Sequence, residues 1–114
     1  TMIGILNLMA QQGDTFNEVP FEILIDSNAL DLTDAIIKMQ VKKDACASAI
    51  LSLTSVGNAG ITITNAVNGQ FKINEQIINI KPCNYQYDIQ IELESGEIKT
   101  YLGGLFQVVK TITE

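Results

Sequence analysis

The chain has 114 residues, of which 46% are hydrophobic, and carries a formal net charge of −6. This composition excludes intrinsic disorder and predicts one domain, residues 1–114, that buries its own core. All seven basic residues are lysine and histidine is absent, so the sequence disfavours nucleic-acid binding and lacks the commonest general base.

The first predicted elements are short strands joined by polar turns. Residues 3–10 are mostly apolar, which predicts a first strand. Residues 21–25 alternate between two faces and predict a second strand. Pro20 just before it suits a sheet edge, because proline has no N–H for a neighbouring strand. Residues 26–28 then predict a turn, since Asp, Ser and Asn bond their own backbone.

Residues 35–43 are compatible with two structures. Residues 33–34 could cap a helix that starts there. The competing pattern places Ile37, Met39 and Val41 on one face and their polar neighbours on the other. This strict alternation fits better than the partial helical stripe, so the segment is predicted to be a strand.

The middle of the chain continues as strands and turns. A loop is predicted at residues 44–47, a strand at 49–54 and a turn at 57–60. A short β-branched strand is expected at residues 61–64. Residues 68–69 are Asn-Gly, a strong hairpin signal because both residue types tolerate positive φ.

The longest regular pattern lies near the end of the chain. Residues 85–93 alternate without a break, and the Ser-Gly pair at 95–96 predicts a turn. Residues 97–101 resume the alternation, with Ile98, Thr100 and Leu102 on one face, so the two runs predict a long antiparallel hairpin. The closing strand is expected to run from residue 98 to about 111. Gly-Gly at 103–104 predicts a bulge or a bend in it.

The spacing of these signals predicts the fold class. Turn signals recur roughly every 8–12 residues, and no segment favours a sustained helix. Residues 75–81 predict either a helical turn or a loop that crosses to the next sheet. The sequence therefore predicts an all-β, antiparallel β-sandwich of seven to eight strands.

No catalytic, cofactor-binding or metal site is predicted. Asp26, Asn28, Asp31 and Asp34 supply enough oxygen atoms to be considered as a calcium loop. The segment lacks the oxygen ligand and the glycine that an EF-hand needs at its fifth and sixth positions. A polar turn between strands is the favoured interpretation.

Two further groups of residues were considered as binding elements. The glycines at 57–60 and 103–104 match no phosphate-binding motif and are interpreted as turn glycines. Tyr85 and Tyr87 share a face with isoleucines, which predicts that they belong to the core. Tyr101 points opposite to Ile98 and Thr100 and is the better candidate for exposure.

Cys46 and Cys83 belong to no Cys-x-x-Cys or Cys/His pattern. Whether they pair is a question of geometry that a sequence leaves open. We expect two free, partly buried thiols in a reducing compartment. A signal peptide is not expected, because residues 2–10 lack a basic n-region, and no apolar run reaches the roughly 20 residues that a membrane-spanning helix needs.

Several segments resemble a pattern in tailed-phage proteins. They are Y-Q-Y-D-I-Q-I at 85–91 and, after an acidic-Ser-Gly turn, T-Y-L-G-G-L-F-Q-V at 100–108. Earlier pieces that fit are G-D-T-F at 13–16, D-L-T at 31–33 and N-G-Q-F at 68–71. The set is similar to the N-terminal domain of siphophage upper-baseplate proteins and related prophage tail proteins, which implies an immunoglobulin-like β-sandwich.

The resemblance implies a non-enzymatic structural role without a cofactor. The protein would dock onto other tail or baseplate proteins through its β-sandwich surface and form a homo-oligomer in the assembly, with no nucleic acid and no membrane insertion. Its expected location is the virion tail, and the bacterial cytoplasm before assembly. The alternative is a bacterial cell-surface immunoglobulin-like module that binds carbohydrate or protein. An upstream signal peptide or a Cys46–Cys83 disulfide would favour that alternative.

Overall fold

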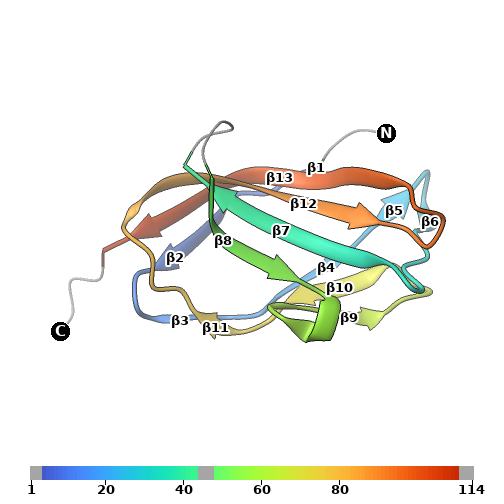
Figure 1. The fold of residues 1–114 in the computed structure, drawn as a ribbon, viewed down its shortest axis with the longest axis horizontal. Coiled ribbons are helices and arrows are strands. Elements are labelled where there is room, and N and C mark those ends of the chain that lie inside the picture. Colours follow the sequence, from blue (N-terminus) through green and yellow to red (C-terminus); the bar gives the residue numbers. More distant parts are fainter. Residues whose placement is uncertain (1–3, 44–47, 111–114) are drawn as a thin grey trace.

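A computed structural model describes residues 4–43 and 48–110 (Figure 1). The strands in chain order are β1 (Gly4–Ile5), β2 (Leu8–Gln11), β3 (Thr15–Phe16), β4 (Val19–Glu22), β5 (Leu24–Ile25), β6 (Asn28–Ala29), β7 (Ile36–Lys42), β8 (Ala49–Thr54), β9 (Ile61–Asn65), β10 (Gln70–Ile73), β11 (Gln76–Ile77), β12 (Cys83–Glu92) and β13 (Ile98–Val109). A 3₁₀ helix, η1 (Val56–Asn58), follows β8. No helix of the described residues has the length and apolar character to cross a membrane.

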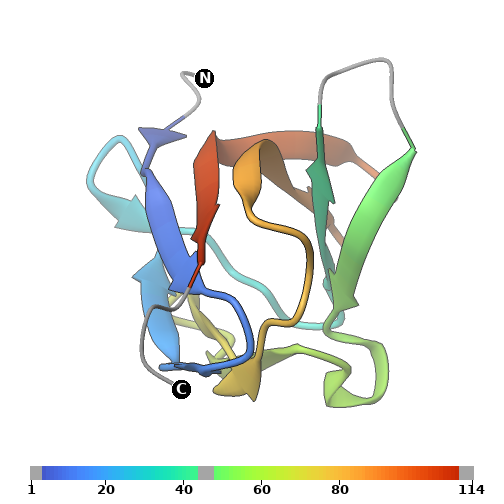
Figure 2. The same cartoon turned by 90° about the vertical axis from the view of Figure 1, so that its left-hand side faces the viewer.

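The strands form two layers with the core between them (Figure 2). The larger sheet has the order β1-β13-β12-β7-β8, and β2 also pairs with β13. The smaller sheet has the order β4-β10-β9. Within the described residues, these six-stranded and three-stranded sheets hold eight strands when β1 and β2 are counted as one interrupted strand. The expected all-β sandwich of seven to eight strands is confirmed.

The strand order is that of an immunoglobulin variable-type sandwich. In that nomenclature β4, β7 and β8 are strands B, C and C′, and β9, β10, β12 and β13 are strands D, E, F and G. The larger sheet then has the order G-F-C-C′ and the smaller sheet the order B-E-D. The topology therefore confirms the immunoglobulin-like character of the fold. Two short pairs, β3–β11 and β5–β6, lie at opposite ends of the long axis (Figure 1).

The N-terminal strand differs from its prediction in two ways. It is interrupted at residues 6–7, and both parts pair in parallel with β13, whereas the other strand pairs of the two described sheets are antiparallel. The Leu6 amide donates to the Gly103 carbonyl at 3.1 Å. The next β13 amide, that of Leu105, donates instead to the Asn7 side-chain oxygen at 3.0 Å. A side chain thus replaces one main-chain acceptor where the strand bends.

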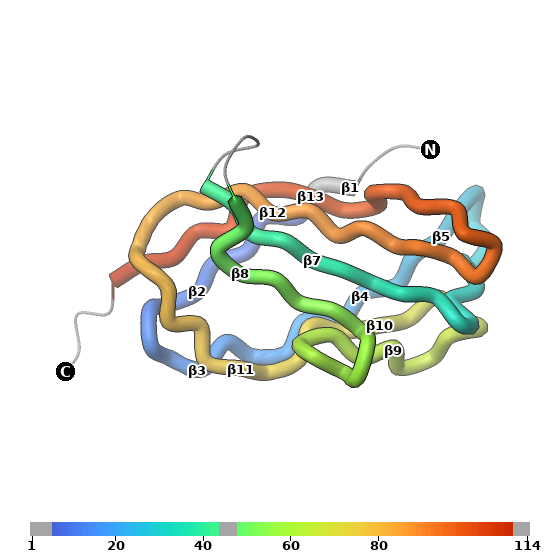
Figure 3. Tube along the Cα trace, in the orientation of Figure 1, coloured from blue at the N-terminus to red at the C-terminus, as the bar shows by residue number. Residues whose placement is uncertain are grey.

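The strand assignments in the middle of the chain are confirmed. Ile37, Met39 and Val41 are buried along β7 while their neighbours are more exposed, as alternation requires. The loop predicted at 44–47 lies outside the described residues. Residues 75–81 contain the short strand β11 and no helix, and they carry the chain from β10 in one sheet to β12 in the other (Figure 3).

The hairpin at residues 68–69 is confirmed, although its geometry differs from the expected one. Only Gly69 has a positive φ, of 67°. Its amide donates to the Ala66 carbonyl at 3.1 Å, and the Asn68 amide donates to the Asn65 side chain at 3.3 Å. The turn therefore needs a left-handed residue at the glycine alone.

The hairpin of β12 and β13 contains its irregularity at Tyr101 and not at the glycines. Ile89 pairs with Leu102 and Gln90 with Thr100, so Tyr101 has no direct partner and is a bulge. Residues 103–104 pair in regular register with β12, so the bulge expected there is wrong.

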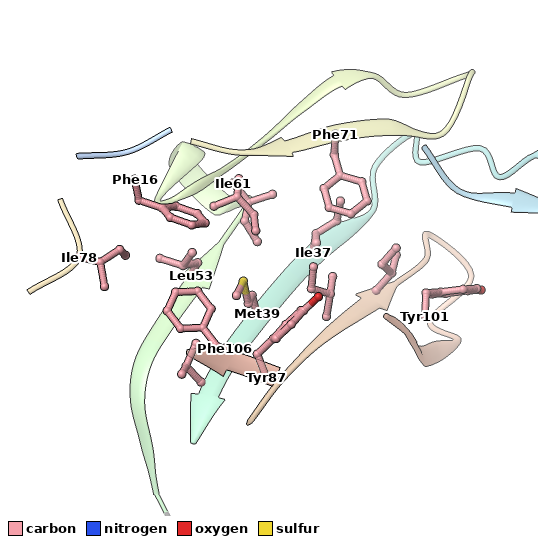
Figure 4. Packing of buried hydrophobic residues seen from close by; sticks show 14 of the residues in the cluster. Phe16, Ile37, Met39, Leu53, Ile61, Phe71, Ile78, Tyr87, Tyr101 and Phe106 are labelled. Atoms are coloured by element: carbon pink, nitrogen blue, oxygen red, sulfur yellow. The ribbon is translucent and has the colours of Figure 1, made fainter. Parts of the chain in front are cut away.

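One continuous core connects the layers (Figure 4). The Phe106 ring of β13 lies 5.8 Å from the Phe16 ring of β3 and 6.4 Å from the Tyr87 ring. Tyr101 is only 7% exposed, so the expectation that it is the exposed tyrosine is wrong. The outward face of β13 near this point is the one that holds Ile98, which is 53% exposed.

Candidate interaction surface

The carboxylates considered as a calcium loop form two polar turns. Asp26 and Ser27 have positive φ between β5 and β6, and the Asn28 side-chain nitrogen donates to the Asp26 carbonyl at 3.3 Å. The Asp31 carboxylate accepts hydrogen bonds from the Thr33 hydroxyl at 2.6 Å and its amide at 2.9 Å, which lower the pKa of Asp31. In the part of the chain that the structure describes, no three His, Cys, Asp or Glu side chains form a metal site.

The glycines considered as phosphate-binding elements have different roles. Gly57 and Gly60 have positive φ in the turn around η1, as interpreted. Gly104 lies inside β13 with a φ of 154°, so its interpretation as a turn glycine is wrong. A Cβ atom at Gly104 would lie 2.6 Å from the Leu6 carbonyl oxygen. Glycine therefore permits the N-terminal strand to approach β13 closely.

Tyr85 forms a tyrosine corner. It lies near the start of β12, the F strand, and its hydroxyl donates to the Lys81 carbonyl four residues upstream at 2.5 Å. Immunoglobulin-type domains have this contact at the same place. Burial, and then the charge of Cys83, raise the pKa of Tyr85. The alternation placed this tyrosine in the core, whereas a tyrosine at the start of strand F could also have predicted the corner.

Tyr87 links β12 to the N-terminal strand. It pairs with Gly104 across the ladder, and its hydroxyl donates to the Leu6 carbonyl beyond β13. The ring therefore crosses β13 where glycine has no side chain. Tyr87 is 4% exposed, and burial raises its pKa to about 12. Immunoglobulin domains with an inter-sheet disulfide have a cysteine two residues after the corner tyrosine, and this chain has Tyr87 there.

Cys83 lies at the start of β12 and is partly buried. Its sulfur atom is 3.8 Å from the Asn84 carbonyl oxygen. Cys46 lies outside the described residues, so two free thiols stay a prediction.

A broad array of side chains covers the solvent side of the larger sheet. Because the tyrosines and isoleucines of β12 point into the core, the residues between them point outward together with their ladder partners. We call this array the outer face. It consists of Met9 of β2, Ile36, Lys38, Gln40 and Lys42 of β7, Ser52 and Thr54 of β8, Gln86, Asp88, Gln90 and Glu92 of β12, and Ile98, Thr100, Gly103, Leu105 and Gln107 of β13.

The outer face has no net charge although the protein is acidic. It contains two lysines, Lys38 and Lys42, and two carboxylates, Asp88 and Glu92, whereas the whole chain carries −6. Between them lie amides such as Gln40, which both donate and accept hydrogen bonds. None of these four charges is in an ion pair with another described residue. The ion pairs of the described chain are Lys72–Glu18 at 3.0 Å and Lys99–Glu97 at 3.7 Å.

One corner of the outer face is apolar. Met9 is 60% exposed and Leu105 is 37% exposed, on the neighbouring strands β2 and β13. A shallow depression of about 340 Å³ lies beside Leu105 and is lined by Gln86, Tyr87, Gly104 and Leu105. Exposed apolar side chains beside a polar surface are common in protein–protein contacts.

The sheet edges are also open to contact, but to different degrees. The prediction that the Pro20 segment is an edge is confirmed, because β4 ends the smaller sheet. Proline offers no N–H to an incoming strand, so this edge is blunted. β8 forms one edge of the larger sheet and contains no charged residue. The Thr54 amide at the end of β8 already donates to the Ala59 carbonyl at 2.9 Å.

Comparison with known proteins gives a structural similarity alone. No family model matches the chain, and no curated protein matches it. Among solved structures it is similar to Drosophila OTK, extracellular domains 3–5, with 17% identity, a TM-score of 0.36 and 93% of this chain covered. The chain covers 33% of that structure. The fold assignment comes from the strand order.

Proposed function

We propose that this protein is a structural module of a phage or prophage tail tip or baseplate. It docks onto other tail proteins through the surface of its β-sandwich and has no enzymatic role. The observation that carries the proposal is the outer face, a broad array of amides and balanced charges on an otherwise acidic protein. Such a surface can bind another folded protein through hydrogen bonds and ion pairs, because its amides both donate and accept and its four charges form no ion pair within the described residues.

The family resemblance and this surface involve the same elements. The segments 85–91 and 100–108, which resemble the tail-protein pattern, lie in β12 and β13. These strands supply the centre of the outer face and its apolar corner. The partners proposed are other tail or baseplate proteins and further copies of this chain, in the virion tail after assembly in the bacterial cytoplasm.

The test is mass spectrometry of phage-like particles purified after prophage induction of the source organism. We expect peptides of this chain at a stoichiometry comparable with known tail proteins, and at far higher abundance than a ribosomal protein measured as a carry-over control. Deletion of its gene is expected to yield particles with incomplete tail tips in electron micrographs. Particles that lack the chain, with the chain present in cell-envelope fractions, would refute the proposal and favour the cell-surface module.

A further inference from the structure

We infer that the outer face is a two-fold symmetric interface between two copies of this chain. The inference rests on the proposed function and deepens it, because it locates the contact between copies of the chain and gives its symmetry. It is carried by the distribution of charge over β7 and β12 and by the size of the face. Its test uses the purified protein, so it can fail or succeed independently of the tail-particle experiment.

The first argument is the cost of bringing two acidic proteins together. Each copy carries −6, so contact between most of their surfaces is opposed by repulsion. The outer face uses two of the seven lysines and two of the thirteen acidic residues, which leaves five lysines and eleven acidic residues elsewhere. All the net charge therefore lies outside this face, and contact through it avoids most of the repulsion.

The second argument is that the face is complementary to itself. The charges of β7 on this face, Lys38 and Lys42, are positive, and those of β12, Asp88 and Glu92, are negative. A two-fold axis along the strands, between β7 and β12, places each β7 against β12 of the second copy. The lysine pair of each copy then faces the carboxylate pair of the other copy, so the same attraction occurs twice in the interface.

The ladder register fits this arrangement in detail. Lys38 is level with Gln90 in the ladder, and the two-fold axis keeps this level. Lys38 would therefore lie opposite Gln90 of the second copy, with Asp88 and Glu92 of that copy on either side. Gln40 is level with Asp88 and would face that carboxylate as a hydrogen-bond donor. The four charges make no ion pair within the described residues and are available to a second copy.

The third argument concerns area and predicts a weak dimer. The strands β7, β8, β12 and β13 have 7, 6, 10 and 12 residues, on average roughly nine. Spaced about 4.8 Å apart, with about 3.3 Å per residue, they cover about 19 by 30 Å. Two copies would bury about 1,100 Å², near the low end of specific interfaces. We therefore expect reversible association with a dissociation constant in the micromolar range, on the order of 10–100 µM.

The decisive experiment is a charge exchange measured by sedimentation velocity from about 5 to 500 µM. One variant carries Lys38→Glu and Lys42→Glu, and a second carries Asp88→Lys and Glu92→Lys. Wild-type protein is expected to dimerise reversibly. Each variant alone is expected to have a dissociation constant raised at least about tenfold, because like charges now face each other. An equimolar mixture of the two is expected to dimerise again, within about threefold of wild type, because opposite charges are restored.

A matched control separates the interface from net charge. Lys81→Glu with Lys110→Glu changes the net charge by the same amount as the first variant, but both lysines lie off the outer face. This control is expected to dimerise like wild type, and circular dichroism checks the folding of every variant. A second readout is the concentration dependence of amide NMR shifts, expected in β7 and β12 and not in β9 or β10.

Two results would overturn the inference. One is wild-type protein that stays monomeric at 500 µM without concentration-dependent shifts on the outer face. The other is a mixture of variants that stays monomeric while the wild type dimerises, which would place the contact elsewhere. Either result leaves the tail-particle experiment unaffected, and a dimer in solution from a chain absent from particles would refute the proposed function alone.

Discussion

Two tyrosines on β12 use their hydroxyl groups for different connections. Tyr85 donates to Lys81, a close neighbour in sequence, and so fixes the start of its own strand. Tyr87 donates to Leu6, 81 residues away, and so connects β12 to the N-terminal strand. A buried hydroxyl is stabilising only where a partner accepts its hydrogen bond. The first contact is local and the second is tertiary, although the side chains share one face.

Loss of the corner hydrogen bond is expected to have a measurable cost. Tyr85→Phe removes the hydroxyl and keeps the ring, and should lower the free energy of unfolding by about 1 kcal/mol, the usual net value of one hydrogen bond. Urea denaturation followed by circular dichroism measures the change. Tyr101→Phe is the control, because the Tyr101 hydroxyl makes no hydrogen bond to the described residues and its loss should cost little. Equal losses in the two variants would contradict the role assigned to the corner.

The raised pKa of Tyr87 predicts how the stability of the protein changes at alkaline pH. Its pKa is raised from 10 to about 12 by burial, so the unfolded chain releases this proton at a lower pH than the folded one. The contribution of Tyr87 is present below about pH 10 and is lost as the pH rises through about 12. Thermal unfolding from pH 9 to pH 12 is expected to show a smaller fall in melting temperature for Tyr87→Phe than for wild type. Parallel curves for both proteins would contradict the prediction.

At the scale of elements, the alternation of side chains predicted where strands lie, but it did not predict which strands pair. Alternation predicted β7 and β12 because a strand with one buried face repeats every two residues. It gave no information on which strands are neighbours, so the parallel pairing of β1 and β2 with β13 was not predicted. The short pairs β3–β11 and β5–β6 are held by tertiary contacts and have too few residues for a pattern.

The same limit explains the errors at the candidate surface. The bulge at Tyr101 shifts the phase of β13, so the face that holds Ile98 and Thr100 was wrongly assigned to the core. The charge balance of the outer face was also hidden, because it depends on β7 lying beside β12. These residues are 46 or more positions apart, and pairing at such a distance leaves no local signal.

Close contact of the N-terminal strand with β13 depends on Gly104. Gly104→Ala places a Cβ atom 2.6 Å from the Leu6 carbonyl oxygen, at a φ of 154°. We expect a loss of at least about 2 kcal/mol, from strain and from displacement of β1 and β2. Hydrogen exchange should accelerate at the amides of Leu6 and Gln12, which donate to β13.

Gly96→Ala is a suitable control for that substitution. Gly96 also has a positive φ, of 92°, but a Cβ atom there meets no heavy atom within 4 Å. Its cost should be limited to the backbone preference, about 1 kcal/mol, and exchange at Leu6 and Gln12 should not change. Accelerated exchange at these amides in both variants would show that strain alone, and not the contact with Leu6, loosens the edge.

At the scale of the whole molecule, one core connects both layers and predicts cooperative unfolding. Phe106→Ala removes a ring that contacts Phe16 and Tyr87 and should cost about 3–5 kcal/mol. Circular dichroism and tyrosine fluorescence are expected to report the same single transition. Leu105→Ala changes the adjacent residue on the outer face and should cost less than about 1 kcal/mol, while weakening self-association. Separate transitions for the two probes would contradict a single core.

The parallel pairing of β1 and β2 with β13 also determines how the domain responds to force. Gly4 is level with Leu102, and Gln11 is level with Val109, so Gly4 and Val109 lie at opposite ends of the paired segment. A pull that separates Gly4 from Val109 acts along the strands in opposite directions and shears them. The hydrogen bonds between these strands, with those of Asn7 and Tyr87, then bear the load together instead of opening one by one. Tension between these two points therefore meets a mechanical clamp, whereas a pull across the β12–β13 hairpin would unzip it at low force.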